Sequence, residues 1–139
     1  MPDPRPTASA MLDPLVAELA RGERDFAAGR FGPACRIAYD VVENAGKAAL
    51  VAVGVSPPKW ADVGPHLDRH RELFPEAHRG GIDTLIFSLR VAWEEREAGF
   101  ESGVGEARAE HLYDDYDARG APDTAARVLA KVRALIDAG

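Results

Sequence analysis

"CRIAYDVVENAGKAAL", residues 35–50, sets one glutamate and one lysine four residues apart in a stretch that is otherwise mostly small and apolar. The apolar residues of this stretch and of the next turn recur at helical spacing and predict one wide buried stripe. Its members are Ile37, Val41, Val42, Ala45, Ala49 and Ala52. Alanines in such a stripe let a neighbouring helix approach closely. The stretch therefore predicts a helix that packs among other helices.

Boundary signals place this helix and the one before it. Asp13-Pro14 is typical of an N-cap followed by proline at the first helical position, and Gly29 is typical of the C-cap that closes the helix. Gly32-Pro33 opens the helix that holds residues 35–50, and Gly54 ends it. Two long helices joined by a short turn are therefore expected in the first half of the chain.

Similar signals predict the helices of the second half. A third helix is expected from near Asp62 to Phe74, where Pro75 stops it, and Gly80-Gly81 breaks the chain again. Ala121-Pro122 begins a last helix. The clearest amphipathic pattern of the chain follows Gly80-Gly81. It consists of Ile82, Leu85, Ile86, Leu89 and Trp93 and predicts another helix. The inward positions expected of the last helix are Ala125, Val128, Leu129, Val132 and Ile136.

The periodicity of the whole chain predicts an all-α fold, because no segment alternates apolar and polar residues over the length of a strand. We expect an antiparallel four-helix up-and-down bundle with one or two extra short helices. Residues 1–10 carry three prolines and are expected to form a loose N-terminal arm. Residues 11–139 are then expected to form a single domain.

Composition limits the function. The chain has 139 residues, of which 46% are hydrophobic, so it needs no metal or disulfide to form a core. Its net charge of −6 works against non-specific binding to nucleic acid or to an anionic membrane. A single cysteine, Cys35, fits a reducing compartment and a small buried side chain. With no leader pattern and no apolar run near 20 residues, a cytoplasmic protein without a membrane span is expected.

Residues 23–58, "ERDFAAGRFGPACRIAYDVVENAGKAALVAVGVSPP", resemble the HEPN domain family, which comprises helical partners and relatives of prokaryotic nucleotidyltransferases. The features that carry the resemblance are Gly29-Arg30-Phe31, Glu43, Lys47-Ala48, Gly54 and Pro57-Pro58. Later segments look like the rest of small, stand-alone members, so the likeness extends over roughly residues 11–138. The resemblance implies a homodimer that acts with a nucleotidyltransferase partner or that binds nucleotide or RNA.

The RNase members of that family, some of them toxins of toxin–antitoxin pairs, carry an Arg-x(4–6)-His motif near their last long helix. The matching region here offers Arg108 and His111, with only two residues between them, followed by Tyr113. His111 could act as the acid or base of RNA cleavage, and Arg108 or Arg96 could stabilise the developing charge. The alternative function is therefore a metal-independent endoribonuclease with His111, Arg108, Arg96 and Tyr113 as its candidate residues.

A literal match to the RNase spacing lies elsewhere, at Arg71 and His78, but it straddles Pro75. A histidine that is only partly exposed beside a loop remains the competing interpretation of His111. The family's His-Asp pair after the proline turn is absent, because Ala61-Asp62 stands in its place.

Glu43 and Lys47, four residues apart, admit two interpretations. They form a weak surface ion pair, or they lie at the edge of the apolar stripe, where a second copy or a ligand phosphate would contact them. Tyr39 joins them as a candidate binding or interface residue. His66 and His70 have a spacing that zinc can use, but a solvated helix face is the favoured interpretation. No metal and no cofactor is predicted.

Overall fold

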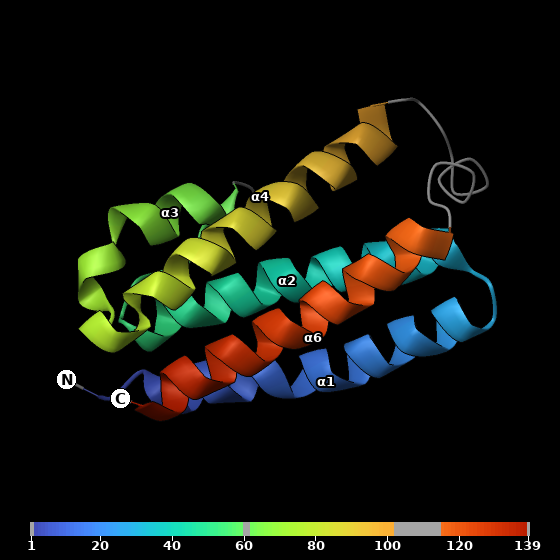
Figure 1. The fold of residues 1–139 in the computed structure, drawn as a ribbon. Helices are drawn as coiled ribbons and strands as arrows, with labels where there is room; N and C mark the ends of the chain where they lie inside the picture. The colour runs from blue at the N-terminus through green and yellow to red at the C-terminus, as the bar shows by residue number, and fades with distance from the viewer. Residues whose placement is uncertain (1, 60–61, 102–114, 139) are drawn as a thin grey trace.

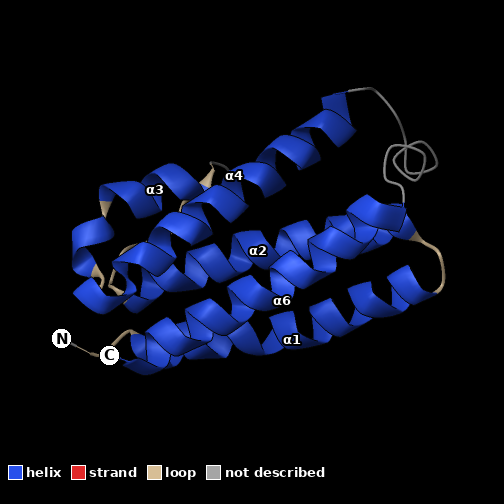
Figure 2. Cartoon of the chain, viewed as in Figure 1, coloured by secondary structure: helices blue, strands red, loops and turns tan. Residues whose placement is uncertain are grey.

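The computed structural model of this protein describes residues 2–59, 62–101 and 115–138, with backbone alone in 95–101 and 115–119. Every regular element in these ranges is helical, as Figure 2 shows, and the prediction of an all-α fold is confirmed. The elements are α1 (Arg5–Ala27), α2 (Phe31–Ala52), α3 (Val63–Arg69), α4 (Arg79–Glu101) and α6 (Asp115–Ala138), with the 3₁₀ turns η1 (Arg71–Leu73) and η2 (Glu76–His78).

Consecutive long helices run in opposite directions (Figure 1). The helices α1, α2 and α6 lie side by side, and each of them packs against the other two. Helix α4 packs on α2 and α3, and it diverges from α6 toward its C-terminal end (Figure 1). This divergence leaves the α4–α6 seam less closely packed than the contacts around α2.

Helix α2 is the centre of the core, because it packs against α1, α3, α4 and α6. Its predicted stripe is buried from Ile37 to Ala49, and Ala52 is partly buried. Small residues are needed here because the neighbours come so close. A Cβ atom added at Gly46 would lie 3.1 Å from Cδ1 of Leu89 on α4 and 3.2 Å from Cγ1 of Val63 on α3. The run of small residues in 35–50 is thus explained by packing.

The N-terminal residues differ from the predicted loose arm. Helix α1 already begins at Arg5, and Ala8 and Leu12 are fully buried in the core. These side chains gain apolar contacts that sequence composition alone did not reveal. Hydrogen bonds from the side chain and the backbone N–H of Arg5 lower the pKa of Asp3, so the small stabilisation from this exposed pair is present at neutral pH and lost as the pH falls.

Two other helix starts also differ from prediction. Gly80-Gly81 does not break the chain but lies in the first turn of α4, and α6 begins at Asp115, so that Pro122 lies inside it. The predicted helix ends are confirmed: Gly29 and Gly54 directly follow the C-cap residues Ala28 and Val53 and adopt φ of 79° and 81°. The inward face predicted for the last helix is buried as expected.

The connection between α3 and α4 is fixed by one apolar and two cationic side chains. Phe74 is only 1% exposed and is the largest of the fully buried side chains in the described residues. Arg71 forms ion pairs with Asp68 on α3 and Asp83 on α4. Arg79 donates from Nε to the carbonyl oxygen of Phe74, at 3.2 Å. The predicted third helix therefore becomes α3 followed by η1, held as a compact corner.

Candidate functional site

The candidate catalytic residues are not brought together by anything the structure describes. His111, Arg108 and Tyr113 lie outside the described residues. Arg96 lies on α4, in the segment where the backbone alone is described. The predicted RNase site therefore stays a prediction from the sequence.

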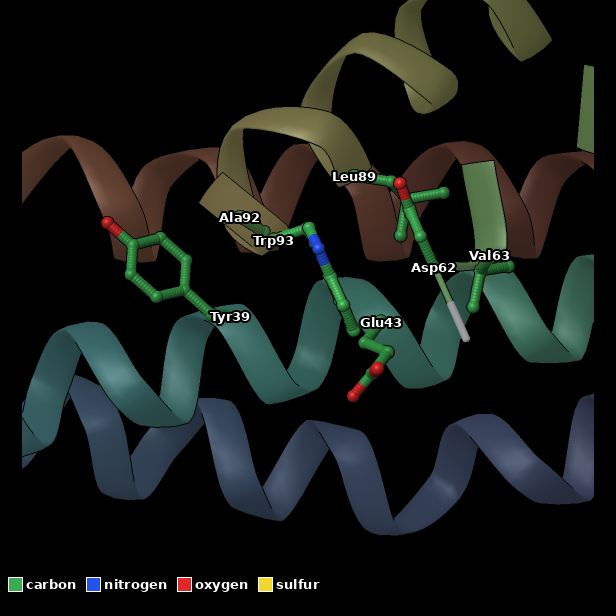
Figure 3. A pocket seen from close by; sticks show the side chains of 7 residues that line it. All are labelled: Tyr39, Glu43, Asp62, Val63, Leu89, Ala92 and Trp93. Carbon is green, nitrogen blue, oxygen red and sulfur yellow. The ribbon is translucent and has the colours of Figure 1, made fainter. Parts of the chain in front are cut away.

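Two of the three predicted binding residues line one shallow pocket between α2 and α4 (Figure 3). Tyr39 and Glu43 come from α2, Trp93 comes from α4, and Asp62 precedes α3. The pocket encloses about 10 Å³. A hollow of this size is at the lower limit for a single water molecule, so it cannot hold a nucleotide.

The carboxylates in this pocket do not form an acid–base pair. Figure 3 shows the carboxylates of Glu43 and Asp62 pointing in different directions. Asp62 instead caps α3, because its Oδ1 accepts a hydrogen bond from the backbone N–H of Gly64 at 3.1 Å. Such a cap contributes about 1 kcal/mol to stability, which gives Asp62 a structural role.

Lys47 lies one turn beyond Glu43 on α2 and is half-buried, but it is not among the residues that line the pocket. Ala45 and Ala49 are fully buried by other residues of the same chain, so they are not accessible to a second copy. A second copy would therefore contact the edge of the α2 stripe, at Tyr39, Glu43 and Lys47, and not the stripe itself.

The other predicted constellations have structural explanations. Arg71 and His78 match the Arg-x(4–6)-His spacing. Arg71 forms ion pairs with Asp68 and Asp83, while His78 lies in η2 beside α6. In residues 2–59, 62–101 and 115–138, no three of the His, Cys, Asp and Glu side chains gather as metal ligands would. Cys35 is fully buried, as predicted.

Sequence reasoning missed an apolar groove between α4 and α6 that we call the α4–α6 groove. Its larger part encloses about 310 Å³ and is mostly apolar. The residues that line this part are Thr84, Leu85, Phe87, Ser88 and Val91 on α4 and Thr124, Arg127, Val128 and Lys131 on α6. Phe87 is 67% exposed and Val91 is 40% exposed.

A second hollow of about 120 Å³ shares Leu85 and Lys131 with the first and extends the groove toward Leu135 and His78. Along α6 the groove thus runs from Thr124 to Leu135, which is about 17 Å at the helical rise per residue. A sequence signal existed: Phe87 and Val91 are four residues apart and lie off the buried stripe of α4.

Comparison with known proteins identifies no relative: no protein family, no curated protein and no solved structure matches the chain. Across the described residues, no helix has both the length and the hydropathy that crossing a membrane requires.

Proposed function

We propose that this protein is a HEPN-like interaction module, an antiparallel four-helix up-and-down bundle that works by binding other proteins. The observation that carries the proposal is the α4–α6 groove, where Phe87 and Val91 stay exposed above a mostly apolar floor. Exposed apolar surface of this kind, bordered by polar residues, is typical of protein–protein contact sites. The alternating helix directions and the resemblance of residues 23–58 support the same proposal.

The module is proposed to act as a homodimer in the cytoplasm, with a nucleotidyltransferase as its partner, as the resemblance implies. The dimer contact that fits best is the edge of α2, where Tyr39, Glu43 and Lys47 follow one another at four-residue spacing and are all half-buried. Two copies that cross there by a two-fold axis would place Glu43 opposite Lys47 of the partner subunit.

Light scattering after size exclusion is expected to give twice the 14.9 kDa mass of one chain. Glu43→Lys and Lys47→Glu should each weaken the dimer by at least about tenfold, because each sets like charges against each other. The combined variant should restore the dimer, since the opposite charges then face each other again. Glu23→Lys, at an exposed position of α1, is the matched control and should leave the dimer unchanged. A monomeric wild-type protein would refute the dimer.

The endoribonuclease alternative is separated by a direct assay. Purified protein is expected to leave single-stranded RNA intact, and His111→Ala is expected to behave like the wild type, as judged by gel electrophoresis of a labelled RNA. Nucleotide or RNA binding without cleavage, followed by fluorescence anisotropy, is compatible with the module. Metal-independent cleavage that disappears in His111→Ala would instead establish the enzyme.

A further inference from the structure

We propose that the α4–α6 groove binds an amphipathic helix with acidic flanks that belongs to a partner protein. This inference rests on the proposed function and names the kind of partner. The floor of the groove, its length and its charge each restrict the occupant.

The apolar floor calls for an occupant with a continuous apolar stripe. Leu85 and Val128 form part of the floor, and the exposed Phe87 and Val91 lie one turn apart on α4. The groove extends about 17 Å along α6, which corresponds to about three turns of an added helix. Side chains at positions i, i+3, i+4 and i+7 of such a helix would match this length.

The shape of the groove favours a helix over an extended peptide. Two helices that diverge leave a space that a further helix can fill by packing its side chains between theirs. An extended peptide that binds by β-strand addition gains its affinity from main-chain hydrogen bonds to an exposed strand. Residues 2–59, 62–101 and 115–138 contain no strand to supply them.

The charge of the groove calls for acidic flanks. Arg127 and Lys131 lie one turn apart on α6, and both line the groove. Among the described residues that line the two hollows, none is aspartate or glutamate. This positive border stands out on a chain whose net charge is −6. Glutamate or aspartate beside the apolar stripe of the partner helix would complement it.

The same charges argue against other occupants. A second copy that docked by a two-fold axis would bring Arg127 and Lys131 against the same two residues of its partner, and a docking without closure would generate filaments. Nucleic acid is disfavoured because the floor is apolar and the whole chain is acidic.

A matched pair of fluorescent helical peptides tests the inference on the full chain. Each peptide has about 18 residues, enough for a marginally stable helix, with leucines at i, i+3, i+4 and i+7. One peptide carries glutamates on both flanks, and the other carries lysines at the same positions. Fluorescence anisotropy is expected to show binding of the glutamate peptide at least about tenfold tighter than of the lysine peptide, with affinity that falls as salt rises.

Variants locate the site. Phe87→Asp is expected to abolish binding of the glutamate peptide, whereas Val16→Asp, at another exposed apolar position, on α1 and 53% exposed, leaves it unchanged. Arg127→Glu with Lys131→Glu should reverse the preference between the two peptides. Arg90→Glu, at an exposed cation of α4 outside the groove, should not. Circular dichroism confirms that each variant remains folded.

Four outcomes overturn the inference. Equal binding of both peptides, lost in Phe87→Asp, would leave the groove as a docking site without preference for acidic partners. Binding that survives Phe87→Asp would place the contact elsewhere, and binding of vesicles containing phosphatidylserine in place of peptide would make the groove a membrane contact. If neither peptide binds, the inference fails, and the light-scattering experiment on Glu43 and Lys47 decides separately whether the interaction module stands.

Discussion

Phe74→Ala is expected to lower the free energy of unfolding by about 3–5 kcal/mol, the usual effect of truncating a fully buried phenylalanine. The side chain is 1% exposed and fills the corner between η1 and η2. The hydrogen bond from Arg79 to the Phe74 carbonyl and the ion pairs of Arg71 hold that corner in place, so it cannot readily collapse into the cavity. Urea denaturation followed by circular dichroism measures the change.

Leu73→Ala is the matched control, because the neighbouring leucine is 54% exposed. Its free energy of unfolding should change by less than about 0.5 kcal/mol, as for most surface substitutions. Because the free energy of unfolding of a small domain is only about 5–15 kcal/mol, Phe74→Ala should remove a large part of it. Equal effects of the two substitutions would contradict the burial of Phe74.

Gly46→Leu is expected to destabilise the protein by about 3 kcal/mol, at the upper end of the range for overpacked cores. The first added atom would already lie 3.1 Å and 3.2 Å from the two Cδ atoms of Leu89 and 3.2 Å from Cγ1 of Val63. The remaining three carbons of the leucine would have to displace α3 or α4. The gain in helix propensity over glycine, about 1 kcal/mol, is too small to offset this strain.

The same substitution at Gly80 separates packing from propensity. Gly80 is exposed in the first turn of α4, and no atom lies within 4 Å of a Cβ placed there. Gly80→Leu should therefore leave stability unchanged or raise it by up to about 1 kcal/mol. Thermal unfolding of both variants checks the contrast, and a stable Gly46→Leu protein would show that α3 and α4 do not approach α2 as described.

The parts of the fold that the sequence predicted are those with a local signal. Helical periodicity identified the buried face of α2, and glycine caps such as Gly29 and Gly54 marked where helices end. The start of α1 was missed because Pro4 and Pro6 favour a loose segment, while the burial of Ala8 depends on neighbours distant in the chain. The start of α6 was missed because a proline usually stands in the first turn of a helix, whereas α6 begins at Asp115 and holds Pro122 in its interior.

The pocket and the α4–α6 groove were less predictable than the helices. They depend on how the helices are placed relative to one another, which the residues of a single helix do not determine. Tyr39 and Glu43 were singled out from one helix, but Trp93 and Asp62 reach the same pocket from elsewhere in the chain. Phe87 and Arg127 are ordinary helix residues in the sequence. They become a feature only where α4 separates from α6, and single-helix periodicity carries no information about that separation.

The central position of α2 has a consequence for synthesis on the ribosome. Helices α1 and α2 are made first and can pair as neighbours, but α6, which packs against both of them, begins more than 60 residues later in the chain. Until residues 115–138 have left the exit tunnel, the nascent chain presents uncovered alanines and valines to chaperones and to other nascent chains. Slow translation of the last third of the message would lengthen that exposure, and early termination there would yield a product prone to aggregation.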